Sequence, residues 1–218
     1  MTNWIVKKRK KRTRKEIINV IETILLPQFS NSENDDFEEL ITTLNFAIFS
    51  YIIELDLSSI ESLLLNKSDK WTRTLIIRNL VLILYESRND FSEFFGRKHP
   101  SGAKQNELIQ SLSSIEELEK IRKEFRKAFG IFEQDFSEIL KNIRHKCLGH
   151  RDHNSKTQYE CISKIDEDLI LNQILPEFRA LLNIINTSYH KILAESLLVG
   201  LEKELIERKK RLNLMEGS

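Results

Sequence analysis

Cysteine, proline and glycine are scarce in this chain of 218 residues, which has two, three and six of them. So few turn-forming residues predict few sharp turns, and two cysteines exclude a disulfide framework. A long apolar run is also missing, because the longest, Leu75–Tyr85, is interrupted by Arg78 and Asn79 and is too short for a bilayer. The N-terminus lacks the apolar segment of a secretory signal. We therefore expect a cytoplasmic protein that does not associate with a membrane.

Basic residues are concentrated near the N-terminus. The stretch Lys7–Lys15 has eight basic residues in nine, and residues 1–15 contain no acidic residue. Because the whole chain has 34 basic and 33 acidic residues, the other 203 residues hold 26 and 33, a net charge of −7. A basic arm on an acidic body predicts a polyanionic partner, either a nucleic acid or an acidic protein surface, whereas a solvated terminus is the alternative. The candidate contacts to a nucleic acid are Lys7, Lys8, Arg9, Lys10, Lys11 and Arg12.

Helix signals dominate the N-terminal half. Thr13 and Glu16 have the form of a capping box, which predicts a first helix that begins there and ends at Pro27. A third helix is predicted over about Lys70–Phe95, ending at Gly96. Between them, a second helix is predicted over residues 36–55, where apolar residues recur at steps of three and four: Phe37, Leu40, Ile41, Leu44, Ile48 and Tyr51.

The C-terminal half also predicts helices. Capping boxes at Ser113 and Ser114 precede a helix that extends to Leu148, with a bend at Gly130. Residues 151–163 predict a polar loop, in which Thr157–Ser163 is a weak strand candidate. A capping box at Ser163–Asp166 and a first-turn proline, Pro176, introduce a final helix that reaches Arg211. The apolar face of the helix before the loop holds Phe132, Phe136, Ile139, Ile143 and Cys147.

Together these segments predict an all-α bundle of about five or six helices with a long C-terminal helix. We divide the chain into a basic arm (1–15), one helical domain (16–212) and a tail (213–218). The final helix has more apolar surface than one bundle is expected to cover, which predicts a homodimer that buries the excess. The residues concerned are Ile192, Leu193, Leu197, Leu198, Leu201, Leu205 and Leu212.

The segment "NIRHKCLGHRDH", residues 142–153, gathers three of the five histidines of the chain. Cys147, His150, His153 and Cys161 offer ligand types that zinc accepts. Their spacing, C-x2-H-x2-H-x7-C, matches no common zinc pattern, and Cys147 lies on an apolar helix face. A polar helix end, where His, Lys and Arg are favoured by the helix dipole, is the simplest interpretation. We expect no metal.

An acid/base site is the third interpretation of the same segment. Imidazole exchanges protons near neutral pH, and a neighbouring arginine can hold a phosphate through forked hydrogen bonds. On one straight helix Arg144 and His150, six residues apart, point in different directions. Gly149 can adopt positive φ and end the helix, which would let His150 turn back toward Arg144.

"RHKCLGH", Arg144–His150, resembles the R-x(4–6)-H motif of HEPN-domain proteins, in which a polar residue, here His145, usually follows the arginine. The preceding amphipathic segment "DFSEILKNI", the following "HRDHNS" and "ISKIDEDLILNQILPEF" are similar to the motif surroundings in abortive-infection members of that family. The resemblance covers about Ile41–Arg211. It implies a HEPN-like helical bundle that dimerises and places two motifs across a shared cleft. Many members are metal-independent ribonucleases that act as toxins or antiviral effectors and need no cofactor.

Carried onto this chain, the resemblance implies that Arg144 contacts the RNA phosphate, that His150 acts as acid or base, and that His145 supports the site. Lys146 and Arg151 are additional candidate RNA contacts beside the motif. Asp152 replaces the tyrosine that many nucleotidylated HEPN toxins carry, so control by that modification is not expected. The leading hypothesis is therefore a dimeric HEPN endoribonuclease with an antitoxin or defence-system partner. The alternative is a non-catalytic module of the same fold that binds nucleic acid or a protein through its basic arm.

Overall fold

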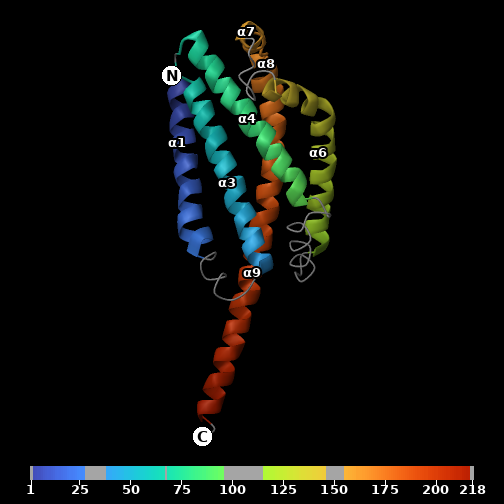
Figure 1. Ribbon diagram of the computed structural model, residues 1–218. Coiled ribbons are helices and arrows are strands. Elements are labelled where there is room, and N and C mark those ends of the chain that lie inside the picture. The colour runs from blue at the N-terminus through green and yellow to red at the C-terminus, as the bar shows by residue number, and fades with distance from the viewer. Residues whose placement is uncertain (1, 28–37, 67, 96–114, 146–154, 217–218) are drawn as a thin grey trace.

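The structure is a computed structural model that describes residues 2–27, 38–66, 68–95, 115–145 and 155–216 (Figure 1). Side-chain positions are described for residues 11–27, 41–66, 68–91, 115–145 and 159–195. The elements, in chain order, are α1 (Thr2–Val20), η1 (Ile21–Leu25), α3 (Glu38–Leu64), α4 (Lys70–Phe95), α6 (Ile115–Ile143), α7 (Ser155–Ser163), α8 (Glu167–Leu169), η3 (Ile170–Ile174) and α9 (Leu175–Glu216). Every element in these ranges is helical, which confirms the predicted all-α fold with a long C-terminal helix.

The first helix does not begin where the sequence predicted. α1 starts at Thr2, so the backbone of the basic arm is part of this helix. Glu16 forms an ion pair with Arg12, whose Nε lies 2.8 Å from Oε1, instead of closing a capping box on Thr13. Lysine and arginine are good helix formers, and pairs four residues apart stabilise a helix further. The predicted start at Thr13 is therefore wrong.

Residues 155–163 are also different from the prediction, because they form α7 and neither a loop nor a strand. Ile162 is buried, and the ring of Tyr159 stacks on Trp71 of α4. Tertiary packing thus determines that this polar segment, whose sequence has only a weak preference for any secondary structure, is helical. Ser163 donates its hydroxyl to the Tyr159 carbonyl within α7, so it does not cap the next helix. Asp166 caps α8 by accepting a hydrogen bond from the Leu169 backbone N–H at 3.0 Å.

Two π-helical turns each end two residues before a proline. In η1 the backbone N–H of Leu26 bonds to the Ile21 carbonyl, and Pro27 follows. In η3 the N–H of Leu175 bonds to the Ile170 carbonyl, and Pro176 follows. A proline ring clashes with the carbonyl four residues earlier in an α-helix, and a wider turn relieves this clash. Pro176 therefore lies in the first turn of α9, as predicted, while helical backbone continues from α8 through η3 into α9.

The core forms where α3, α4 and α6 meet α9 (Figure 1). Phe46 of α3 packs on Tyr189 of α9 with ring centroids 4.9 Å apart. Phe178 of α9 stacks on Phe91 of α4 at 5.5 Å and lies 5.8 Å from Phe132 of α6. The predicted apolar face of α6 is confirmed as far as it is described, because Phe132 is buried and the partly buried Phe136, Ile139 and Ile143 pack against the core.

The elements outside this core set the shape of the molecule. α1 packs along α3, α6 lies beside α4, and the C-terminal part of α9 extends past the other helices (Figure 1). The N-terminus of α1, the C-terminal end of α6 and α7 lie at one end of the bundle (Figure 1). Among the described residues, no helix combines the length and the apolar character that crossing a membrane requires.

Candidate functional site

Arg144 lies directly after α6, in a helical turn that continues through His145. Its Nε and Nη2 both donate to one carboxylate oxygen, Glu86 Oε1 of α4, at 3.4 Å. The two side chains are 32% and 47% exposed. Charge-assisted hydrogen bonds in well-formed ion pairs are about 2.7–2.9 Å long, so this contact is weak. Arg144 is thus only loosely held by Glu86, and its guanidinium remains partly accessible.

Three polar side chains lie around the ring of Tyr85 in α4. The Arg144 and Arg88 guanidinium carbons each lie 5.6 Å from the ring centroid, within the range of a cation–π contact. The exposed His145 ring stands nearly perpendicular to the tyrosine ring, with centroids 6.4 Å apart. The sequence-predicted pair Arg144 and His145 therefore meets an aromatic surface formed by α4.

Arg88 completes this cluster and is held more firmly than Arg144. Its guanidinium forms a forked pair with Glu133 of α6, including an Nη2–Oε2 bond of 2.8 Å. This hydrogen bonding raises the pKa of Arg88 above its usual value. The Arg88–Glu133 pair connects α4 to α6.

The remaining motif residues lie outside the described residues. These are Lys146, Cys147, His150, Arg151 and His153, so the predicted approach of His150 to Arg144 stays a prediction. Cys161, the fourth residue of the zinc alternative, is a partly buried free thiol in α7. Within the part of the chain that the structure describes, no three His, Cys, Asp or Glu side chains are grouped so that they could hold a metal ion.

The predicted basic contacts lie along α1. The backbone of Lys7, Lys8, Arg9 and Lys10 is helical, and the side chains of Lys11 and Arg12 are exposed. The N-terminal turns of α1 lie at the same end of the bundle as the C-terminal end of α6 (Figure 1). The fold therefore brings the basic segment and the Arg144 segment, more than 130 residues apart in sequence, to one end.

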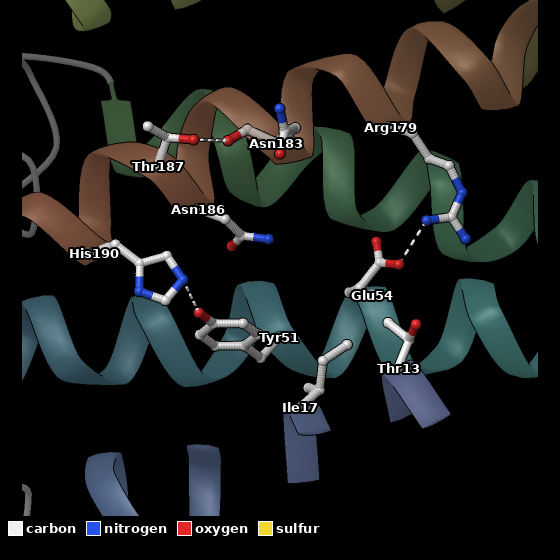
Figure 2. A pocket seen from close by; sticks show the side chains of 9 residues that line it. All are labelled: Thr13, Ile17, Tyr51, Glu54, Arg179, Asn183, Asn186, Thr187 and His190. Carbon is white, nitrogen blue, oxygen red and sulfur yellow. Dashed lines mark hydrogen bonds and ion pairs between the residues drawn. The ribbon is translucent and has the colours of Figure 1, made fainter. Parts of the chain in front are cut away.

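A pocket of about 360 Å³ between α1, α3 and α9 was not predicted from the sequence (Figure 2). On one side, the Tyr51 hydroxyl forms a hydrogen bond with His190 Nε2. On the other side, Glu54 pairs with Arg179 (Figure 2). No sequence signal joins these residues, because they come from three helices far apart in the chain. The lining consists of Thr13, Ile17, Tyr51, Glu54, Arg179, Asn183, Asn186, Thr187 and His190.

The charged groups of this pocket are satisfied by one another. Arg179 Nη1 lies 2.6 Å from Glu54, and its Nη2 lies 2.7 Å from Glu61. Burial lowers the pKa of Arg179 most strongly, but the charges and hydrogen bonds of the two carboxylates outweigh burial and raise this pKa overall. Burial also raises the pKa of Tyr51, so its hydroxyl, already protonated at neutral pH, stays protonated to a higher pH than that of an exposed tyrosine. The polar side chains that line the pocket accordingly form a network of hydrogen bonds and ion pairs that joins α3 to α9.

Comparison of the chain with protein-family models, with curated proteins and with solved structures finds no match. The resemblance to the HEPN family therefore rests on the motif and its flanking residues.

Proposed function

We propose that this protein is a metal-independent endoribonuclease of the HEPN type, in which Arg144 binds the scissile phosphate and His150 transfers the proton. The observation that supports this proposal most is the position of Arg144. Its guanidinium is partly exposed, rests against Tyr85 and has only 3.4 Å contacts to Glu86. A phosphate oxygen that bonds at shorter distance can therefore replace the carboxylate.

In the proposed reaction, the ribose 2′-oxygen attacks the adjacent phosphorus while the bond from phosphorus to the 5′-oxygen breaks. The 2′-hydroxyl proton passes to a base, and the 5′-oxygen receives a proton from an acid. His150 serves in one of these roles. Arg144 neutralises the charge that builds on the phosphate, and the neighbouring His145 supports the site. The products are a 2′,3′-cyclic phosphate and a 5′-hydroxyl, and no metal or cofactor enters the reaction.

The proposed enzyme acts as a homodimer in which each copy supplies one Arg144 and one His150 to a shared cleft. The support is the backbone of α9, whose C-terminal part extends beyond the bundle and whose sequence there alternates apolar with charged residues (Figure 1). Burial of that segment against a second copy would remove apolar surface from water. Light scattering at micromolar concentration should give the dimer mass, and an active monomer would contradict this part of the proposal.

A toxin or defence effector is the biological role that fits such an activity, with an antitoxin or defence-system protein as partner. The alternative function is a non-catalytic module that binds nucleic acid or a partner through its basic segment. Two observations favour keeping this alternative: the continuous helical backbone of the segment and the exposed side chains of Lys11 and Arg12.

Incubation of the purified protein with total RNA in EDTA separates the two functions. Cleavage with cyclic-phosphate ends supports the enzyme, provided that His150→Ala and Arg144→Ala preparations made in parallel leave the RNA intact. Bound but uncut RNA favours the module. Cleavage that persists in both variants would assign the activity to other residues or to a contaminant.

A further inference from the structure

Two large aromatic side chains are stacked on each other at the surface, where both are mainly exposed. Trp71, in the first turn of α4, is 54% exposed, and Tyr159 of α7 is 61% exposed. Their rings are nearly parallel, with an interplanar angle of 16° and centroids 6.2 Å apart. The contact joins α7 to α4, yet it leaves more than half of each side chain open to solvent.

The N-terminal part of the basic helix α1 lies at the same end of the bundle as α7 and the start of α4, which hold this aromatic pair (Figure 1). Arg14 donates from Nη1 to the Ser58 carbonyl at 3.0 Å and to the Ser62 hydroxyl at 2.6 Å, which places it near the C-terminal end of α3. α1 runs antiparallel to α3, so the residues before Arg14 lie toward that end of the bundle (Figure 1). There the chain turns from α3 into α4, whose second residue is Trp71. Basic residues of α1 and the exposed aromatic rings therefore lie at one end of the molecule.

The acidic side chains around the pair serve the local structure. Asp69 caps α4 by accepting hydrogen bonds from the Thr72 hydroxyl at 2.5 Å and the Thr72 N–H at 3.0 Å. Glu167 forms an ion pair with Arg73, and Asp166 caps α8. The Arg73–Glu167 pair joins α4 to α8, and the Trp71–Tyr159 stack joins α4 to α7. The exposed Lys70 and Lys164 lie near the aromatic pair in the chain.

We propose that Trp71 and Tyr159 form a stacking platform for the bases of single-stranded RNA, while the basic turns of α1 hold its phosphates. Every base has a flat face, so stacking on aromatic rings is tolerant of sequence, and a neighbouring basic surface follows the backbone. Bases in a duplex are stacked on one another, which excludes them from the platform. This inference rests on the proposal that the protein binds RNA, but it does not require cleavage.

Trp71 itself reports on the proposed contact. In a Trp4→Phe background Trp71 is the one remaining tryptophan. The probe is a 2′-O-methyl oligouridylate of twelve nucleotides, which lacks the attacking hydroxyl and so stays intact. We expect it to quench the fluorescence of Trp71, whereas inorganic polyphosphate, which has charge but no bases, should bind without quenching. Equal quenching by both probes, or no quenching by bound oligonucleotide, would overturn the platform.

Substitution of Trp71 or Tyr159 measures how much each ring contributes to the affinity for the oligonucleotide. Trp71→Leu and Tyr159→Leu should each weaken oligonucleotide binding about tenfold and leave the slope of log affinity against log salt unchanged, because stacking releases no counterions. Ile131→Ala in α6, which removes a side chain of similar exposure (53%), is the matched control and should bind as the unmodified chain does.

The outcomes separate the platform from the ribonuclease. Unchanged affinity in folded Trp71→Leu and Tyr159→Leu proteins contradicts the platform, even if wild-type protein cleaves RNA. A platform that binds RNA without any cleavage contradicts the ribonuclease alone. If Tyr159→Leu loosens α7, seen as a lower helical signal, the fluorescence experiment on the intact pair still decides the platform.

Discussion

Two arginines of this protein have nearly the same exposure and yet differ in what they can do. The side chains of Arg179 and Arg144 are 27% and 32% exposed. Arg179 holds two carboxylates, each only 19% exposed, at 2.6 and 2.7 Å. Arg144 contacts a single carboxylate, that of Glu86, which is 47% exposed and lies 3.4 Å away. The contacts, rather than exposure, thus separate a guanidinium that stabilises the fold from one that can accept a new anion.

The largest expected effect is on RNA cleavage. Arg144→Ala and His150→Ala should each lower the rate by about 100-fold or more, because each removes one part of the proposed phosphate and proton chemistry. Cleavage of a fluorescent oligonucleotide in EDTA measures this rate. Thermal unfolding should be nearly unchanged, since the Arg144 contact is weak. A large fall in the unfolding temperature of either variant would instead mark that residue as structural.

Arg179→Ala should show the opposite pattern, with lower stability and retained cleavage at low temperature. It removes the cation that bridges Glu54 and Glu61, which we expect to cost about 2 kcal/mol. Urea unfolding followed by circular dichroism gives this free energy. The control is Arg12→Ala, which breaks a pair whose arginine is 83% exposed and should cost under about 0.5 kcal/mol. Equal costs in the two variants would show that the Arg179 contacts stabilise the fold no more than an exposed ion pair does.

Glu86→Gln tests whether Glu86 competes with RNA for Arg144. Removal of the charge should raise RNA affinity by about two- to fivefold, the range expected for the loss of an exposed ion pair. Fluorescence anisotropy with an uncleavable oligonucleotide measures the change. Glu138→Gln, which removes another exposed carboxylate of a surface pair, should change affinity less. Weaker binding in Glu86→Gln would mean that Glu86 positions Arg144 for the phosphate.

A further modest effect concerns Tyr51→Phe, which removes the hydrogen bond to His190 and should cost about 1 kcal/mol at neutral pH. The pKa of Tyr51 is raised by burial, so its contribution is complete below the unfolded-state pKa of about 10 and is lost as pH rises through the higher folded-state value. The stability difference between the two proteins should therefore narrow above about pH 10. A stability difference that stays constant above about pH 10 would show that burial does not raise the pKa of Tyr51.

The sequence predicted correctly the helices whose first and last residues are determined by neighbouring capping residues and glycines. α4 begins and ends where predicted, at Lys70 and Phe95, because Asp69 caps its first turn and a glycine follows its last residue. α7 escaped prediction because its helical state depends on Ile162 in the core and on Tyr159 against Trp71. Hydrophobic periodicity shows which face of a segment is apolar. A short polar segment has too few apolar residues for this periodicity to distinguish a helix from a loop or a strand.

The candidate site shows the same division between local and distant information. The motif identified Arg144 and His145 as residues of interest, since their types and spacing are visible in the chain. Their partners were not predictable, because Glu86 and Tyr85 lie almost 60 residues earlier and meet Arg144 only when α4 packs on α6. Likewise, no pattern links Tyr51 to His190, 139 residues later.

The π-helical turn η3 sets the angular phase between α8 and α9. It holds one residue more than an α-turn, and each helical residue adds about 100° of rotation. Deletion of one residue between Ile170 and Ile174 would rotate Glu167 away from Arg73, although Phe178 and the rest of α9 could keep their places in the core. That single extra residue behaves like an insertion that the fold has come to depend on, so this turn should tolerate substitution far better than a change in length.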